Sequence, residues 1–507
     1  MGKKGKDRKK GKGAEKTALK TEKKLSNKQK KELAALGEDD IENILANIEK
    51  DEQKRQKVTE TVVEPPSRRV NFSLVAHPDK EELILFGGEF FNGQKTFVYN
   101  DLFLYNIVHN QWTLVKAPMG PPPRCGHQMV ATSSGKGQLW LFGGEFASQT
   151  QSQFYHHRDL WVYHLFTKKW EKITAPGGPS ARSGHRMVYC RKQLFVFGGF
   201  HDNLRDYKYF NDVHVFNLET YAWTKLDVTG AGPAPRSGCG MVALNDGRIL
   251  VYGGYSKERI KKDVDKGRVY SDMFVLMADK NDTTGLKYKW LPTKCTGVHF
   301  NPRCAMTMTL APNSSAYCFG GVFDVEDDEE DISGTFFNDM YTLDVEKMAW
   351  RQLTLSGKRE RARKPKCRDE DDLQVDAAEE MDEEPTALAT TVSEDGVFTV
   401  KVGPAPSSSS VQCSSVVVDG PRLFQPSPRM NCGLTVKHGV LYLYGGMYED
   451  GSKQLTYSDF YALDLKKLEE WKIIQADDLA NQEWLGSDSE SDDESEEDSE
   501  DAAMDTE

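Results

Sequence analysis

Arginine and aspartate recur along the sequence at a regular spacing, and together they could form charge-assisted hydrogen bonds. Six arginines each stand 16–19 residues before a Gly-Gly pair: Arg69, Arg124, Arg182, Arg236, Arg303 and Arg429. Six aspartates each follow such a pair: Asp101, Asp159, Asp212, Asp272, Asp339 and Asp459. Because each occurs once per repeat, we expect a structural role, in which each Arg satisfies carbonyls or a carboxylate between neighbouring repeat units.

Patterns typical of catalysis are missing from the sequence. It has no Gly-x-x-x-x-Gly-Lys-Ser/Thr, no His-Glu-x-x-His and no Gly-x-Ser-x-Gly. The nine cysteines form no Cys-x-x-Cys pair, which argues against a zinc site or a disulfide framework and for reduced thiols inside the cell. His156 and His157 are the one adjacent histidine pair, and two neighbouring histidines in a loop rarely make a metal site without further Cys or acid ligands. We therefore predict no enzymatic activity, no cofactor, no metal and no small-molecule substrate.

The elements that would carry these residues follow from an internal repeat. Each Gly-Gly pair ends an apolar run, such as LILFGG at Gly88 or LWLFGG at Gly144, and most intervals are 55–67 residues long. An Asp-led apolar strand and then a Trp follow in every unit: Trp112, Trp170, Trp223, Trp290, Trp350 and Trp471. A period near 50 with four short strands, here named a to d, is typical of a β-propeller blade. The sequence predicts an all-β, six-bladed propeller.

The Gly-Gly pair, the spaced aromatic residue and the Trp resemble the kelch repeat. The loops at Phe90–Asp101, Gly143–Gln149, Phe197–Tyr207 and Tyr255–Gly267 are similar to those of the Kelch domain-containing protein 4 family of eukaryotes. That resemblance covers nearly the whole chain and implies a kelch propeller with an intracellular role and no catalytic motif. Other kelch proteins are substrate receptors of ubiquitin ligases, but the BTB domain or cullin-box helix of those receptors is not recognisable here.

Two segments compete to close the ring. Glu470–Ile474 contains Trp471 and is the favoured outer strand of the sixth blade. Glu60–Pro65 occupies the same place before Arg69 that Thr113–Pro118 occupies before Arg124, so it could take that role instead or add a fifth strand.

One face of the propeller is expected to bind a partner. Loops b–c and d–a lie on the same face of antiparallel blades, and the b–c loops are the longer ones, which favours recognition there. These loops are rich in aromatic and basic residues, the usual anchors of interfaces. The predicted contact residues are Phe91, Lys95, Tyr155, His156, His157, Arg158, His201, Arg205, Tyr207, Lys257, Arg259, Lys261 and Lys262.

Packing competes with binding for some of these aromatic residues. For Phe91, Tyr155 and Tyr207 the two interpretations are evenly balanced. Tyr99 and Phe210, next to strand c, are expected to pack under their own loops. The fifth blade differs, because its loop is acidic from Asp324 to Asp331.

An insertion at 357–427 separates the fifth and sixth blades. It begins with seven basic residues within Lys358–Arg368, which fit a nuclear localisation signal, a patch for an anionic partner or a merely solvated loop. Gly396–Val402 is a candidate extra strand, and the rest is expected to be disordered. The predicted organisation is a basic tail at 1–57, a propeller at 58–475 and an acidic tail at 476–507.

The two ends of the chain carry opposite charge. Residues 1–31 have a net charge of +11 and residues 487–507 a net charge of −12, so both are expected to be disordered. Ile41, Ile44, Leu45 and Ile48 form one apolar stripe of a short helix that Asp39 or Asp40 could cap, and docking on the same chain is slightly favoured. Ser487, Ser489, Ser491 and Ser495 each have an acid three residues on, which resembles acidophilic-kinase sites.

Taken together, these features favour a non-enzymatic scaffold or adaptor that binds one or more proteins. No run approaches 18 apolar residues and no signal peptide is recognisable, so we expect an intracellular protein of the cytoplasm, the nucleus or both, without a membrane partner. A ribosome-assembly or RNA-linked factor is the first alternative, because the Lys-rich tail could bind phosphates. A substrate receptor of a ubiquitin ligase is the second and rests on the fold alone.

Overall fold

The computed structural model describes residues 33, 37–55, 57–202, 206–261, 264–282, 284–326, 332–357, 423–451, 453–477, 479 and 482–486. At 261, 264, 324–326 and 332–333 it describes the backbone alone. The predicted tails at 1–31 and 487–507 and the insertion from 358 to 422 lie outside these residues, as do the candidate strand Gly396–Val402 and the candidate phosphorylation sites.

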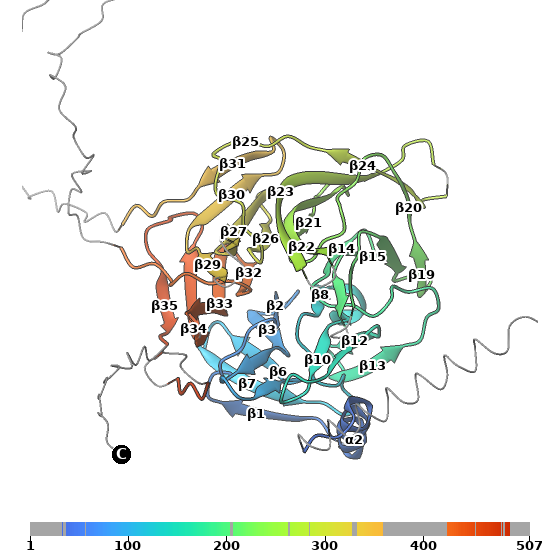
Figure 1. Ribbon diagram of the computed structural model, residues 1–507, viewed down its shortest axis with the longest axis vertical. Helices are drawn as coiled ribbons and strands as arrows, with labels where there is room; N and C mark the ends of the chain where they lie inside the picture. The colour runs from blue at the N-terminus through green and yellow to red at the C-terminus, as the bar shows by residue number, and fades with distance from the viewer. Residues whose placement is uncertain are drawn as a thin grey trace, which may run out of the picture. The chain divides into compact units, whose positions relative to one another are not determined.

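Within the described residues, the strands form six antiparallel blades arranged around a central axis (Figure 1). In order from strand a to strand d, the first three blades are β2 (Ser73–Ala76), β3 (Glu82–Phe86), β6 (Leu102–Asn106) and β7 (Gln111–Lys116); β8 (Gln128–Thr132), β9 (Gln138–Phe142), β12 (Leu160–His164) and β13 (Lys169–Ile173); and β14 (Arg186–Cys190), β15 (Gln193–Phe197), β18 (Val213–Asn217) and β19 (Ala222–Lys225). The next three are β21 (Gly240–Ala243), β22 (Ile249–Lys261), β23 (Val264–Ala278) and β24 (Lys287–Pro292); β26 (Thr307–Ala311), β27 (Ser315–Phe319), β30 (Met340–Asp344) and β31 (Ala349–Gln352); and β32 (Gly433–Lys437), β33 (Val440–Asp450), β34 (Lys453–Asp464) and β35 (Lys472–Gln475). The innermost strand of each blade contacts that of the next, and β2 contacts both β8 and β32, so the ring is closed.

Ring closure follows the favoured prediction. The outer strand of blade six is β35, which pairs with β34 beside the buried Trp471. The competing N-terminal segment is β1 (Thr59–Val63), which adds a fifth strand to blade one by pairing antiparallel with β7. Two further fifth strands were not predicted: β20 (Asp227–Thr229) pairs parallel with β24, and β25 (Thr296–Gly297) pairs parallel with β31.

The core consists of clusters that each join two neighbouring blades. The aromatic residue before each Gly-Gly pair packs against the Trp of the following blade: Phe86 with Trp170 at 5.4 Å between ring centroids, Phe142 with Trp223 at 5.4 Å and Phe197 with Trp290 at 5.5 Å. The same pair forms at the closure between Tyr444 of blade six and Trp112 of blade one, at 5.7 Å. Aromatic residues bury the most apolar area of any side chain, so the repeated Phe and Trp supply the contact that holds consecutive blades together.

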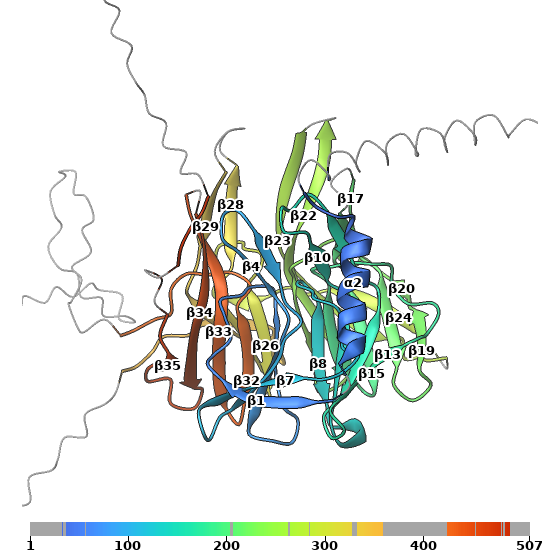
Figure 2. The ribbon, with the colours of Figure 1, turned by 90° about the horizontal axis from the view of Figure 1, so that it is seen from below.

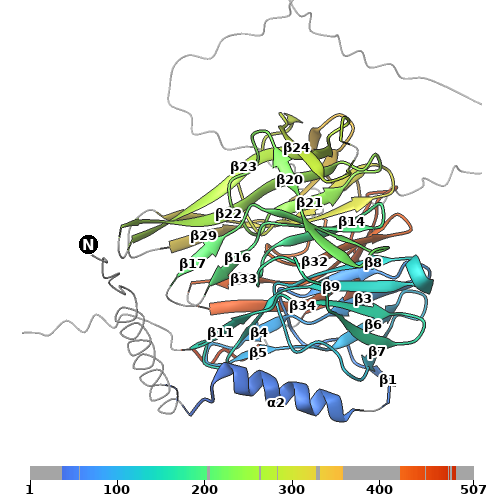
Figure 3. The same cartoon turned by 90° about the vertical axis from the view of Figure 1, so that its right-hand side faces the viewer.

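Helix α2 (Ile41–Lys54) lies along the rim of the propeller beside blades one and two (Figure 3). The side chain of Asp40 caps it by accepting a hydrogen bond from the Glu42 N–H at 3.0 Å. Leu45 is buried, and the Ile41 N–H donates to Gln153 Oε1 at 2.9 Å. Docking on the same chain, the favoured prediction, is confirmed. A short 3₁₀ helix, η1 (Ser134–Lys136), precedes β9.

Candidate partner-binding surface

One face of the propeller carries the b–c connections, which form β-hairpins that extend beyond the blades (Figure 2). We call this side the hairpin face. Its separate hairpin strands are β4 (Glu89–Phe91) and β5 (Thr96–Val98), β10 (Glu145–Ala147) and β11 (Phe154–His156), β16 (Phe200–Asp202) and β17 (Tyr207–Tyr209), and β28 (Val322–Glu326) and β29 (Ile332–Phe336). In blades four and six the long strands β22, β23, β33 and β34 continue into the hairpin themselves.

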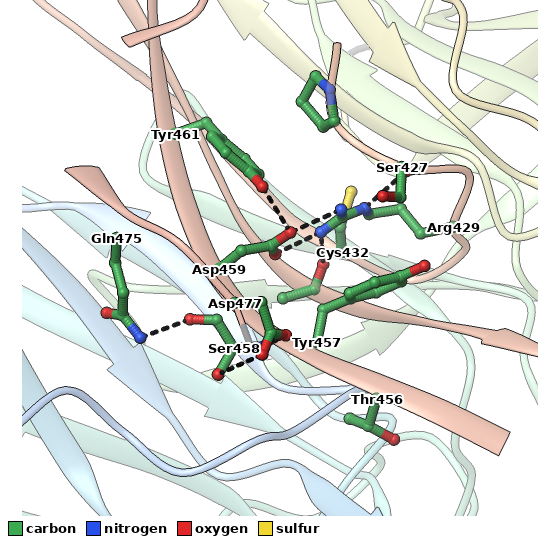
Figure 4. A network of polar contacts seen from close by, with 12 residues as sticks. Ser427, Arg429, Cys432, Thr456, Tyr457, Ser458, Asp459, Tyr461, Gln475 and Asp477 are labelled. Carbon is green, nitrogen blue, oxygen red and sulfur yellow. Dashed lines mark hydrogen bonds and ion pairs between the residues drawn. The ribbon is translucent and has the colours of Figure 1, made fainter. Parts of the chain in front are cut away.

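The recurring Arg and Asp residues form ion pairs where strands a and c begin, at the end of each blade that carries the hairpin. Each Arg is buried, and in four blades its guanidinium lies 2.5–2.8 Å from the strand-c Asp: Arg124–Asp159, Arg182–Asp212, Arg236–Asp272 and Arg429–Asp459. Arg303 makes the same contact with Asp339, whereas Arg69 is 3.7 Å from Asp101. Figure 4 shows the pair in blade six, where Tyr461 also donates to Asp459.

The structural role predicted for these arginines is confirmed, but their side chains do not bridge neighbouring blades. Arg124 donates to the carbonyl of Gly143 at 2.9 Å and to Asp159, and both acceptors belong to its own blade. Its backbone supplies the link to blade one, because the Arg124 N–H donates to the Tyr99 carbonyl and the Gly88 N–H donates to the Arg124 carbonyl. The planar guanidinium links the carbonyl of the first glycine of the pair to the strand-c Asp, so it stiffens one blade.

An aromatic ring covers most of these guanidinium groups. Tyr99 lies 4.2 Å from Arg69 and Phe210 lies 4.0 Å from Arg182, which agrees with the prediction that both rings pack under their loops. In blade two His157 takes the equivalent place two residues before the strand-c Asp, and its side chain is buried. Burial and the charge of Arg124 lower the pKa of His157 well below its ordinary value. The placement of His157 among exposed contact residues was therefore wrong.

The His156 side chain is also buried and does not reach the surface. Its ring lies 4.6 Å from that of His201, and its Nε2 accepts a hydrogen bond from the Asp202 N–H at 3.0 Å. Burial is the main cause that lowers its pKa to about 4, so the ring is neutral at physiological pH. Its place among the contact residues was wrong for the same reason as that of His157.

The remaining predicted contact residues fall into three groups. Exposed side chains are those of Lys95, Tyr155, Arg158, Lys257 and Arg259. Half-buried ones are those of Phe91, His201 and Tyr207. Arg205 and Lys262 lie outside the described residues, and Lys261 is described by its backbone alone. Of the acidic loop of blade five, Asp324–Asp331, the structure describes only the backbone of residues 324–326 at the end of β28.

Tyr207 joins two hairpins instead of standing free. Its hydroxyl donates to Asp265 Oδ1 at 2.7 Å, across the gap between the hairpins of blades three and four. Lys257 and Arg259 approach both groups, with Arg259 5.3 Å from the Tyr207 ring and Lys257 3.3 Å from Asp265. The balance drawn for Tyr207 between packing and binding therefore moves toward packing.

The inner strands surround a central cavity of about 790 Å³. Glu145, the first residue after a Gly-Gly pair, lines this cavity and is near Glu89, the corresponding residue of blade one. Burial, with the neighbouring Glu89 as a smaller cause, raises the pKa of Glu145 to about 8. The prediction from sequence missed both carboxylates. The signal was present, since blades one and two read Gly-Gly-Glu and the other blades carry an apolar or aromatic residue there.

Replacing Glu145 by glutamine should remove the part of the pH dependence of the unfolding free energy that comes from the titration of this carboxyl. The folded pKa of about 8 lies above the ordinary value of 4.5, so the proton stabilises the fold fully below pH 4.5 and this contribution is lost as the pH rises to about 8. We expect the urea midpoint of the wild type to fall between pH 5 and 9, while Glu145→Gln gives a flatter profile and about 1–3 kcal/mol more stability than the wild type at pH 9. Parallel profiles for the two proteins would contradict the burial of this carboxyl.

The chain is similar over part of its length to several known proteins. Residues 69–284 match the family model "FBX42, beta-propeller domain". The chain is 24% identical over 58% of its length to N-(sulfonatooxy)prop-2-enimidothioate sulfolyase of Thlaspi arvense, of which it covers 82%, and 34% identical over 32% of its length to Acyl-CoA-binding domain-containing protein 5 of Arabidopsis thaliana, of which it covers only 24%. The solved structure of YjhT aligns with 82% of this chain and 99% of its own at a TM-score of 0.49 and 13% identity.

The closed ring of antiparallel blades defines the chain as a β-propeller. With the Gly-Gly, Arg, Asp and Trp positions repeated in each blade and the family match over residues 69–284, the chain is a kelch-repeat β-propeller. Among the described residues, no helix is long and apolar enough to span a membrane, and no group of three or more His, Cys, Asp or Glu side chains could hold a metal ion.

Proposed function

We propose that this protein is a non-enzymatic scaffold or adaptor that binds a partner protein on the hairpin face. The observation that carries the proposal is the common direction of the b–c hairpins, which extend past the blades on one side only (Figure 2). Rigid blades with projecting hairpins give a broad, preorganised surface, and preorganisation reduces the entropy lost on binding.

The side chains on this face support a protein partner. Tyr155 is 38% exposed on the hairpin of blade two, Arg158 is exposed just after that hairpin, and Lys95 is exposed between β4 and β5 of blade one. Tyr and Arg combine a large contact area with directional hydrogen bonds and are enriched among the residues that dominate binding energy. The loops similar to those of the Kelch domain-containing protein 4 family occur on this face, so we assign the chain to that family as part of the proposal. An action through the Lys-rich tail would involve residues outside the described ones.

A paired comparison within blade two tests the proposal. The full-length chain is purified from cells after RNase treatment, and the copurifying proteins are quantified for Tyr155→Ala with Arg158→Ala. The control is Phe166→Ala with Lys168→Ala, which removes one aromatic residue and one cation from the c–d turn on the opposite face, where Phe166 is 68% exposed.

We expect a defined set of proteins to fall about tenfold with the hairpin variant and less than twofold with the control, since losing 1.4 kcal/mol of binding corresponds to a factor of ten. Melting temperatures should match that of the wild type. Equal recovery of these proteins with both variants would count against the hairpin face. If the proteins are lost from the wild type after RNase treatment, compared with an untreated sample, the result would favour an RNA-linked role.

A further inference from the structure

A short segment from the C-terminal part of this chain lies on the hairpin face. Gln482–Gly486 lies across the junction between blade six and blade one and contacts the hairpins of both. We call the space between the outer part of β34 and the β4–β5 hairpin the junction groove. The prediction from sequence placed these residues in the acidic tail and gave them no role.

Gln482 recognises the backbone of blade six. Its side-chain Oε1 accepts a hydrogen bond from the Thr456 N–H at 3.1 Å, and its Nε2 donates to the Gln454 carbonyl at 2.9 Å. One side-chain amide thus pairs with two backbone groups of the same strand, much as the peptide group of a neighbouring strand would. Asparagine is one methylene shorter and alanine has no amide, so this end of the groove selects glutamine.

Blade one receives the other end of the segment. The Trp484 ring meets the Phe91 ring edge to face, with centroids 5.7 Å apart, and the Leu485 N–H donates to the Asn92 carbonyl at 2.8 Å. Gly93 has φ +94°, and a Cβ there would clash with the Gly486 backbone. A glycine in the hairpin therefore allows a second backbone to approach closely.

The contacts of the segment Gln482–Gly486 with the junction groove are incomplete. Trp484 Nε1 is buried and has no hydrogen-bond partner among the described residues, while Leu485 remains 38% exposed. A buried N–H without an acceptor costs about 1–3 kcal/mol. A peptide with phenylalanine in place of the tryptophan would avoid this cost and still meet Phe91.

We propose that the junction groove is a binding site for extended peptides of partner proteins that present a glutamine and, two residues later, an aromatic residue, and that Gln482–Gly486 is a resident competitor. The inference rests on the proposed function of the hairpin face and specifies one class of partner for it. Because the resident segment is tethered, its high effective concentration weakens the apparent affinity of every partner peptide.

The test uses the full-length chain and a fluorescein-labelled peptide with the sequence of residues 479–486. Binding is measured by anisotropy to the wild type, to Gln482→Ala with Trp484→Ala, and separately to Leu485→Pro, which removes the N–H donated to Asn92. Each variant removes contacts that hold the resident segment, and neither changes a residue of a blade, so the second remains informative if the first folds poorly.

We expect each variant to bind the peptide at least tenfold more tightly than the wild type. Adding Phe91→Ala should abolish the gain, a Trp→Ala peptide should not bind, and a Trp→Phe peptide should bind as tightly or up to fivefold more tightly. Equal peptide affinity for wild type and both variants, or binding unaffected by Phe91→Ala, would overturn the proposal. The blade-two comparison of Tyr155 and Arg158 uses other hairpins, so a negative peptide result leaves the proposed function to be decided separately.

Discussion

Asp459→Asn is expected to lower the free energy of unfolding by about 3–5 kcal/mol. The carboxylate is 2% exposed, and the guanidinium of Arg429 is fully buried beside it, with Nη2 2.7 Å from Asp459 Oδ2. Asparagine keeps the approximate shape but removes the charge, so Arg429 is left as an uncompensated buried cation. Tyr461, which donates to the same carboxylate at 2.9 Å, loses its acceptor strength as well.

The matched control is the same substitution in blade one. Asp101 is 31% exposed, and its carboxylate lies 3.7 Å from Arg69, too far for a direct hydrogen bond. Asp101→Asn should therefore cost about 1 kcal/mol or less, as expected for a partly solvated pair. Guanidinium unfolding followed by far-UV circular dichroism gives both values. Equal losses for the two variants would mean that burial does not determine the strength of these pairs.

Properties that recur in every blade were predictable from the sequence. A Gly-Gly pair, a Trp and an Arg repeat because each blade packs against its neighbour in the same way. The ring contact between Phe86 of blade one and Trp170 of blade two is one instance of this packing. Ring closure was also predictable, since Trp471 marks its strand as an outer one. The strands β20 and β25 were not, because Asp227–Thr229 and Thr296–Gly297 are short and mostly polar and lack the alternating apolar pattern of a strand.

The candidate surface was harder to predict, because the type of a residue does not reveal which side of a hairpin it faces. His156 and His157 are adjacent in a loop that sequence alone treats as exposed, yet one packs on His201 and the other takes the aromatic position beside Arg124. Phe91 was predicted as a contact residue without its occupant, Trp484, which is nearly four hundred positions away in sequence. Contacts between such distant segments depend on the closed ring, which brings blade six beside blade one.

Gly143→Ala is expected to cost about 3 kcal/mol of stability, or more. The residue has φ +66°, and an added Cβ would lie 2.7 Å from His185 Cε1 and 2.8 Å from the Arg182 carbonyl oxygen, both in the next blade. His185 is fully buried against the Phe142 ring and has no free space to move into. The left-handed conformation adds about 1–2 kcal/mol for any L-residue, and overpacking adds about 1–3 kcal/mol.

Gly439→Ala separates these two causes. Gly439 has a similar φ of +76°, but the nearest heavy atom to its added Cβ is Lys466 Cε at 3.8 Å, an ordinary contact. This variant should lose only the conformational cost, about 1 kcal/mol. The difference between the two midpoints in guanidinium therefore measures how closely neighbouring blades approach at the Gly-Gly turn. If Gly143→Ala were no more harmful than Gly439→Ala, the first glycine of the pair would serve the backbone conformation alone, and the blades could separate at this turn without cost.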